Sequence, residues 1–398
     1  MKKFVKQQDL IFFTIVTLFW FAQYVYIPYQ TTFLTLTGVS SSFTGVVIGA
    51  YGITQLLLRF PVGLFADRSG VHKPFILIGA LASGLASLLR IYPSGGIGFL
   101  LANLLSGLAS SMWISFMVFY MNQRANEDQQ AATGRIILFN NAGMLLGFII
   151  SMLTFDYFGM KWICLLSLLA GLLAFGLGLW LKEEPVSHQP VAISELVKVL
   201  SIRRLWMFSF IALIQQGIQL TTTMSFTTQI LKDLGATSLA VGLASTIYMI
   251  AAVLFSAFAS AKFGGQKRPR IWIPLVLIVV SLYCFFVPRV NAIWLIFILQ
   301  ILPGMSTGIL FSFATSEAMK GIPDEKKSTA MGFYQAFYAL GMSLFPMFTG
   351  YAVTHYSIVV GYTILAGIAL VGCLAVTIFY KKRQTIAVVQ GRIVNGSE

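Results

Sequence analysis

The sequence predicts an all-α polytopic membrane protein with twelve transmembrane helices in two six-helix bundles. Of its 398 residues, 57% are hydrophobic and only 10% are charged, whereas soluble domains carry about 25% charged residues. The apolar residues form runs of about 20 or more, long enough for a helix to cross a hydrocarbon core. The runs lack the period of two that a membrane β-barrel requires, so they are predicted to be helices.

Twelve apolar runs are predicted to be spans and are numbered helices 1 to 12 in chain order. Their centres lie near residues 22, 54, 82, 110, 143, 171, 217, 250, 280, 305, 341 and 369. The first run begins at Leu10 and is too long for the core of a signal peptide. It is therefore expected to stay in the protein as a transmembrane helix.

The placement of basic residues predicts the orientation of the chain. With a cytoplasmic N-terminus, 22 of the 27 basic residues lie on the cytoplasmic side. The others are Arg59, within helix 2, and four residues in outer connections: Arg90, Lys161, Lys232 and Arg289. This asymmetry predicts a multi-pass protein of the plasma membrane with both termini in the cytoplasm. The net charge of +14 then reflects orientation and contact with anionic membrane lipids, and no nucleic-acid partner is expected.

The longest connection divides the chain into two parts. The predicted organisation is a six-helix bundle at 1–181, a cytoplasmic linker with an amphipathic helix at 182–204, a second bundle at 205–383, and a cytoplasmic tail at 384–398. The two bundles resemble each other weakly at offsets of 197 and 198 residues, where the matching pairs are Gly45 and Gly242, Tyr51 and Tyr248, Gly134 and Gly332, Phe139 and Phe337, and Gly143-Met144 and Gly341-Met342. Parallel repeats of this kind place a substrate site between the bundles near the membrane midplane.

One motif follows helix 2. Residues 63–73 read Gly-Leu-Phe-Ala-Asp-Arg-Ser-Gly-Val-His-Lys, which resembles the signature of the major facilitator family between its helices 2 and 3. The resemblance implies a gating motif made of Gly63, Asp67, Arg68, Gly70 and Lys73. Gly63 is expected to allow close helix packing, and Gly70 a tight turn.

In the family, the motif aspartate contacts the start of helix 11 and closes the inner side of the carrier. The resemblance therefore implies that Asp67 meets Ser328 and Thr329. Val71 replaces the family's usual basic residue, so the ion pair must be remade by His72 or Lys73, or be absent. The equivalent turn in the second half, near 262–270, has no aspartate.

Uncharged polar and aromatic residues lie on particular faces of the predicted helices. The resemblance places helices 1, 4, 7 and 10 around a central cavity, and the polar faces agree with it. The predicted substrate-pathway residues are Gln23, Tyr26, Gln30, Asn103, Ser110, Trp113, Asn140, Gln215, Gln216, Gln219, Gln300, Thr307, Tyr334 and Tyr338, with a kink expected at Pro303-Gly304. Each single residue could equally serve helix packing through hydrogen bonds, whereas the whole set favours a wet cavity.

Charged residues are scarce inside the spans. No Asp or Glu lies near the middle of a run, so the candidate coupling residues are Asp67, Glu317 and Arg59. Arg59 is interpreted either as a pathway residue or as a side chain that snorkels to the inner interface. A central Arg or Lys is expected to be missing, which favours a neutral or zwitterionic, partly apolar substrate. Without proton coupling, the alternative is facilitated diffusion.

The resemblance implies a secondary transporter that works by alternating access. The compact form resembles bacterial exporters, which favours efflux of a drug or metabolite. The helix 4 arginine of the family is replaced by Asn103, and the antiporter pattern of helix 5 is reduced to Gly143 and Gly147, so the motifs do not establish proton antiport. The alternatives are a sugar or nutrient uptake permease, for which Gln215-Gln216 is a faint signal, and a lipid flippase.

Other classes of protein are disfavoured by missing motifs. The sequence has neither a recognisable nucleophile with its base nor an HExxH pattern, so no enzyme is predicted, and it lacks the GxxxxGK[ST] phosphate loop of an ATP-driven pump. The three cysteines, Cys164, Cys284 and Cys373, lie in separate apolar runs. No metal site or cofactor is expected, and a monomeric carrier is predicted.

Overall fold

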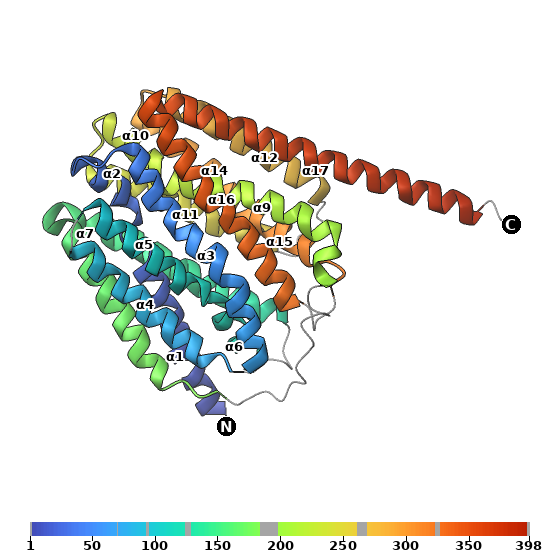
Figure 1. Ribbon diagram of the computed structural model, residues 1–398, viewed down its shortest axis with the longest axis horizontal. Coiled ribbons are helices and arrows are strands. Elements are labelled where there is room, and N and C mark those ends of the chain that lie inside the picture. The colour runs from blue at the N-terminus through green and yellow to red at the C-terminus, as the bar shows by residue number, and fades with distance from the viewer. Residues whose placement is uncertain are drawn as a thin grey trace.

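The computed structural model describes residues 2–69, 71–92, 95–123, 129–183, 198–260, 269–322 and 327–395, and the described elements are all helical (Figure 1). The N-terminal bundle contains α1 (Lys2–Tyr24), α2 (Ile27–Leu36), α3 (Ser41–Ser69), α4 (Lys73–Ile91), α5 (Gly96–Ser111), α6 (Trp113–Gln123) and α7 (Gln129–Leu179). The C-terminal bundle contains η1 (Lys198–Ser201), α9 (Arg203–Thr221), η2 (Thr222–Phe226), α10 (Thr227–Asp233), α11 (Ser238–Ser260), α12 (Pro269–Phe286), η3 (Val287–Arg289), α13 (Ile293–Leu299), α14 (Ile301–Met305), η4 (Ser306–Leu310), α15 (Phe311–Met319), α16 (Lys327–His355) and α17 (Ile358–Asn395).

Ten helical segments of the described chain are long and apolar enough to cross a membrane. One of them, Arg135–Leu179, is too long for a single span. It contains Gly159 at φ 71, where two helices meet in a conformation that favours glycine. The rod Arg203–Asp233, formed by α9, η2 and α10, is helical but is not among the ten. The all-α membrane fold is confirmed, and the count of twelve is reached only when α7 is divided at Gly159 and this rod is added.

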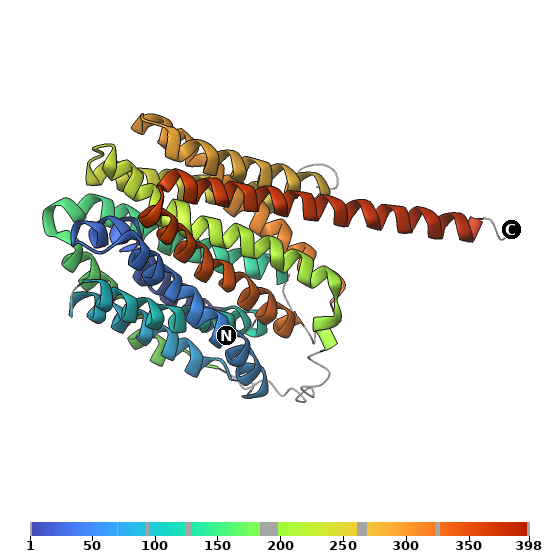
Figure 2. The same cartoon turned by 45° about the horizontal axis from the view of Figure 1, so that its top comes forward.

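The helices form two groups that meet along two seams. In the N-terminal bundle, α7 packs against α1 and α4, and α5 packs against α3 and α4. In the C-terminal bundle, α9 packs against α16, and α12 packs against α17. The seams between the bundles are formed by α3 with α16 and by α7 with α11. The C-terminal part of α17 extends past the other helices (Figures 1 and 2).

Glycines set the spacing at the first seam. A Cβ added to Gly45 would lie 2.3 Å from the carbonyl oxygen of Pro346, and one added to Gly49 would lie 2.5 Å from that of Ser343. Small residues at such positions let two membrane helices approach closely. The long contact of α3 with α16 therefore depends on glycine, which has no Cβ, at positions 45 and 49 of α3.

Four helical rods are interrupted, namely those of predicted helices 1, 4, 7 and 10. The first is interrupted between α1 and α2, and the second at Met112. The third contains the π-helical turn η2, and the fourth contains the π-helical turn η4, which begins two residues after Gly304. Such irregular turns are frequent at functional sites and in the helices that line transporter cavities. They occur in the same four helices that were expected around the centre.

Candidate functional site

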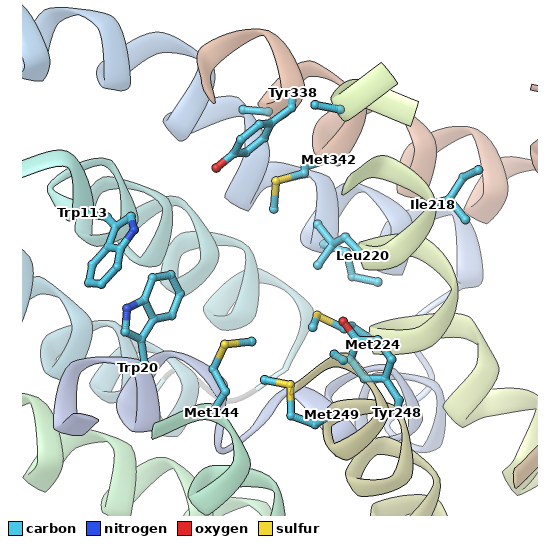
Figure 3. Close-up of a cluster of buried hydrophobic side chains, with 14 of the residues drawn as sticks. Trp20, Trp113, Met144, Ile218, Leu220, Met224, Tyr248, Met249, Tyr338 and Met342 are labelled. Atoms are coloured by element: carbon cyan, nitrogen blue, oxygen red, sulfur yellow. The ribbon is translucent and has the colours of Figure 1, made fainter. Parts of the chain in front are cut away.

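A group of buried apolar and aromatic side chains, here called the central cluster, lies where the two bundles face each other (Figure 3). Its members are Trp20, Trp113 and Met144 from the N-terminal bundle, and Leu220, Met224, Tyr248, Met249, Tyr338 and Met342 from the C-terminal bundle. Methionine is flexible and polarisable, and tryptophan offers a large flat surface, so the cluster can adapt to varied apolar groups.

Trp20 is a member of the central cluster that the sequence did not reveal. Its side chain is 7% exposed and meets the ring of Trp113 edge-on, with ring centroids 5.1 Å apart. The indole N–H has no hydrogen-bond acceptor among the residues that the structure describes. A buried donor without a partner costs about 1–3 kcal/mol, which makes this N–H a candidate contact for a ligand.

A small cavity lies beside the central cluster. Its volume is near 10 Å³, which is room for roughly one water molecule. Four predicted pathway residues line it, namely Gln23, Tyr26, Gln30 and Asn103, together with Tyr24, Ile27, Ile48, Tyr51 and Leu220. The side-chain carbonyl oxygens of Gln23 and Gln30 are buried and have no donor. In this conformation the cavity is too small for an organic substrate, although its walls offer free acceptors.

A polar triad joins three helices of the N-terminal bundle. Gln23 Nε2 lies 3.3 Å from Ser110 Oγ and also donates to the carbonyl oxygen of Ser106. The hydroxyl of Tyr51 lies 2.6 Å from Ser110 Oγ. Predicted helices 1, 2 and 4 are therefore linked at the edge of the cavity.

A matching triad joins the corresponding helices of the C-terminal bundle. Gln219 Nε2 donates to the hydroxyl of Tyr248 at 2.6 Å, and this hydroxyl lies 3.1 Å from Thr307 Oγ1. Gln215 Nε2 extends the chain by donating to Gln219 Oε1 at 2.8 Å. The three residues of this triad lie about 197 positions after those of the first, which agrees with a repeated architecture.

Arg90 is the main departure from the sequence prediction, which placed it in an outer connection and expected no central Arg or Lys. Its side chain is only 2% exposed. It donates to Asn103 Oδ1 at 3.0 Å, to Ser106 Oγ at 2.9 Å and to Ser87 Oγ at 3.1 Å. The guanidinium carbon lies 3.5 Å from the centre of the Tyr26 ring. The expectation that no Arg or Lys lies near the substrate cavity is therefore wrong.

Arg59 is a second buried arginine, and it bridges the two bundles. It is 3% exposed and donates to Gln335 Oε1 at 2.8 Å and to the hydroxyl of Tyr338. Both acceptors belong to α16, whereas Arg59 belongs to α3. The snorkelling interpretation is wrong, because the side chain points into the seam and not toward the membrane surface.

The remaining pathway candidates fall into two groups. Gln300 accepts from the hydroxyl of Tyr283 at 3.0 Å, and the hydroxyl of Tyr334 lies 3.0 Å from Thr315 Oγ1, so both residues bond within the C-terminal bundle. Asn140 and Gln216 are half-buried, and their side chains form no hydrogen bond in the part of the chain that the structure describes. Trp113 and Tyr338 lie in the central cluster (Figure 3).

The structure describes only part of the gating motif. Gly70 and the side chains of Asp67 and Arg68 lie outside the described residues. Gly63 shares a small pocket with Thr329 at the start of α16. A Cβ on Gly63 would lie 3.9 Å from Ile114, which is an ordinary contact, so the prediction of close packing at this glycine is wrong.

Lys73 ties together two helices of the N-terminal bundle. Its Nζ donates to the carbonyl oxygens of Leu179 and Leu181 at the end of α7. The carboxylate of Glu183 accepts the backbone N–H groups of His72 and Lys73 at 2.6 and 2.8 Å. Negative charge is favourable at a helix N-terminus and positive charge at a C-terminus, so these contacts fasten α4 to the end of α7.

Glu317 forms an ion pair inside the C-terminal bundle. Its carboxylate pairs with the guanidinium of Arg204 and accepts the hydroxyl of Tyr380 at 2.9 Å. The two charged side chains are 11% and 8% exposed. Among the described residues, no three His, Cys, Asp or Glu side chains are grouped as a metal would require.

Comparison with known proteins identifies the family of the chain. The family model of the Major Facilitator Superfamily matches residues 12–228 and 205–392. An uncharacterised transporter of this type from Methanocaldococcus jannaschii, MJ1560, is 21% identical over 329 residues, which are 79% of this chain and 83% of that protein. A stretch of 95 residues, 24% of this chain, is 32% identical to the inner membrane transport protein YajR of Escherichia coli K12 but covers only 21% of YajR.

Solved structures show the same fold. The nucleoside transporter NupG has a TM-score of 0.71 at 15% identity, covering 94% of this chain and 99% of that one. The human organic anion transporter MFSD10 has a TM-score of 0.70 at 13% identity, covering 93% and 99%. The chain therefore belongs to the major facilitator superfamily of membrane transporters.

Proposed function

We propose that the protein moves a small amphiphilic organic compound across the plasma membrane by alternating access, with the compound bound at the central cluster. The observation that carries the proposal is that both bundles contribute to this buried surface (Figure 3). A site made jointly by two bundles can open to either side when one bundle rocks against the other. A site enclosed in one bundle could not do so.

Contacts between the bundles supply two gates for this movement. On the predicted inner side, Arg59 bonds to Gln335 and Tyr338. On the predicted outer side, the hydroxyl of Tyr29 donates to the carbonyl oxygen of Ser238 at 2.8 Å. Alternating access requires that one set of contacts breaks while the other holds, and we assign these two sets to opposite ends of the pathway.

The further details of the proposal follow from the sequence. Export by a monomeric carrier with both termini in the cytoplasm is the direction and topology we propose. If transport is coupled to protons, Asp67 and Glu317 are the candidate carriers, and the ion pair with Arg204 would have to open for Glu317 to take part. A compound with hydrogen-bonding groups fits the side-chain amides of the two triads.

Counterflow in proteoliposomes tests the proposal. Purified protein is reconstituted and screened for exchange of labelled amphiphilic metabolites and drugs, with and without a proton gradient. Replacing Gln219 by Ala is expected to lower exchange at least about tenfold, because it removes the donor to Tyr248 and one polar wall of the site. The lipid-facing change Leu254→Ala, at a side chain 64% exposed, is the matched control and is expected to leave exchange unchanged. Equal exchange in both variants would contradict the proposed site.

A further inference from the structure

Arg90 is a buried cation without a counter-charge. Its guanidinium forms no ion pair with a carboxylate of the described chain. Glu317 is paired with Arg204, Glu183 holds backbone N–H groups, and Asp156 is exposed. A charge inside the membrane region is expensive unless it is paired, and unpaired examples mark functional sites. Within the described residues, no carboxylate therefore neutralises the charge of Arg90.

The guanidinium group of Arg90 also has N–H donors that its three hydrogen bonds do not use. An arginine side chain has five N–H donors in a fixed fork, and the hydrogen bonds of Arg90 to Ser87, Asn103 and Ser106 use three of them. Nε is buried and has no acceptor. All three present acceptors are neutral, so the contacts orient the group without neutralising it. A planar oxyanion is the ligand that such a fork binds best.

Two residues connect Arg90 to the cavity. The Tyr26 ring lies against the guanidinium at 3.5 Å, and Asn103 Oδ1 accepts from it at 3.0 Å. Both residues also line the cavity, together with Gln23 and Gln30. Arg90 therefore lies one side chain behind the cavity wall, and a rotation of Tyr26 or Asn103 would bring a bound anion into contact with it.

The C-terminal bundle shows that the fold itself does not require a cation here. Gln300 lies 197 residues after Asn103, and its carbonyl oxygen accepts a hydrogen bond from the neutral phenol of Tyr283 at 3.0 Å. In the N-terminal bundle, Arg90 donates to the matching amide. Because a neutral phenol serves as the donor to the matching amide in the C-terminal bundle, the charge of Arg90 needs another explanation.

We propose that Arg90 binds an anionic group of the transported compound, so that the substrate is a small amphiphilic organic anion, or a zwitterion that carries a carboxylate, sulfonate or phosphate. This rests on the proposed function and names its substrate class. The anionic end lies at Arg90, and the free carbonyl oxygens of Gln23 and Gln30 accept N–H or O–H groups of the same molecule. The apolar end lies on the central cluster.

Matched probes that differ only in charge test the proposal. Naphthalene-2-carboxylate, naphthalene-2-sulfonate, naphthalene-2-carboxamide and 2-naphthylmethylammonium are titrated into the purified full-length protein, and binding is followed by thermal stabilisation. We expect the two anions to bind the wild type at least about tenfold more tightly than the amide. The substitution R90Q is expected to remove this preference, so that the variant binds the anions and the amide within about twofold of each other.

Three further variants separate charge from folding. R90K keeps the charge and is expected to retain part of the preference. N103D places a carboxylate 3.0 Å from the guanidinium, where the amide oxygen now lies, and is expected to abolish the preference while Arg90 stays in place. R289Q makes the same change of charge at an exposed arginine in η3, which follows α12, and is expected to behave as the wild type.

The inference is overturned if no anion of the panel binds, if the amide or the ammonium binds as tightly as the anions, or if R90Q keeps the preference for anions. Counterflow separates this result from the proposed function. Exchange of neutral compounds only, equal in the wild type and R90Q, would refute the anion site and leave the transporter intact. Binding of anions without exchange of any compound would refute the transport proposal and leave the anion site.

Discussion

The two bundles use the same scaffold but differ in charge. Each has a hydrogen-bonded polar triad at its central edge, and each brings a glycine of one helix against the backbone of another. A Cβ on Gly143 would lie 2.3 Å from the carbonyl oxygen of Thr17, and one on Gly341 would lie 2.2 Å from that of Leu213. These pairs lie close to 197 residues apart, so the repeat is preserved at the level of single contacts.

The two bundles differ in the residue that donates a hydrogen bond to the amide next to each triad. Arg90 donates to Asn103 in the first bundle, whereas Tyr283 donates to Gln300 in the second. Arg59, the other buried arginine, also belongs to the first bundle. The second bundle instead contributes most of the methionines of the central cluster. The N-terminal bundle thus supplies the electrostatic part of the site, and the C-terminal bundle supplies the adaptable apolar part.

The largest expected effect tests whether the glycine contacts are equivalent. Gly143→Ala and Gly341→Ala each place a methyl group against a carbonyl oxygen at about 2.3 and 2.2 Å, so the helices must separate. We expect a loss of about 3 kcal/mol or more of stability in each variant, seen as a lower melting temperature in detergent. Gly176→Ala and Gly367→Ala, which have open space around the added Cβ, are the controls. Destabilisation by only one of the first two changes would break the equivalence.

The next-largest losses of stability are expected when the carboxylates at the predicted inner ends of the two bundles are replaced. Glu317→Gln leaves Arg204 without its buried counter-charge and is expected to cost about 3 kcal/mol. Glu183→Gln weakens two hydrogen bonds to the backbone at the start of α4 and is expected to cost about 1 kcal/mol. Thermal unfolding measures both. Adding Arg204→Gln to Glu317→Gln should restore part of the loss, and no restoration would mean that the pair does not stabilise this end.

The periodic features of the fold were accessible to sequence reasoning. Long apolar runs predict the helices because the membrane core fixes their length. A kink was expected at Pro303-Gly304, and the π-helical turn η4 begins two residues after Gly304. Polar spacing on helix 1 placed Gln23, Tyr26 and Gln30 on one face, and all three line the cavity. The spacing could also mislead, since Gln300 bonds within its own bundle.

The missed residues show the limit of pattern analysis. Trp20 lies in an apolar run, where an indole looks like any other hydrophobic residue, and only the structure reveals its unpaired N–H. Arg90 lies in the last turn of α4, where an arginine can extend either to water or back into the bundle. A count of charges by loop cannot distinguish these directions. The neighbouring Ser87 and Asn103 were a usable signal, because they offer acceptors on the inward side.

A smaller effect is expected at the hydrogen bond of Arg59 to Gln335 of α16, which has no equivalent in the second bundle. The position 197 residues after Arg59 is Ser256, which carries no charge. Arg59→Gln removes the charged bond to α16 on the predicted inner side, which is worth about 1.5–3 kcal/mol in general. Labelling of a cysteine placed at Thr329 by a membrane-impermeant maleimide should rise about tenfold. Tyr338→Phe should act in the same direction, and the exposed Tyr356→Phe should not; unchanged labelling would show that Arg59 is no gate.

The smallest expected effect sharpens the comparison of the triads. Tyr248→Phe removes a hydroxyl that bonds to both Gln219 and Thr307, whereas Tyr51→Phe removes one that bonds to Ser110 alone. Ser110 keeps a second donor, but the amide of Gln219 is left without an acceptor. We therefore expect a loss of about 1–2 kcal/mol for Tyr248→Phe and about 0.5–1 kcal/mol for Tyr51→Phe.

Thermal unfolding of the two variants beside Tyr157→Phe, a change at an exposed tyrosine, measures the difference. Equal losses would mean that the hydroxyl of Tyr248 stabilises the C-terminal bundle through one partner only. A larger loss of stability for Tyr51→Phe would mean that the N-terminal triad is the stronger of the two. The electric field of the nearby Arg90 would then strengthen its hydrogen bonds. In that case the charge of the N-terminal bundle would contribute to its stability as well as to recognition.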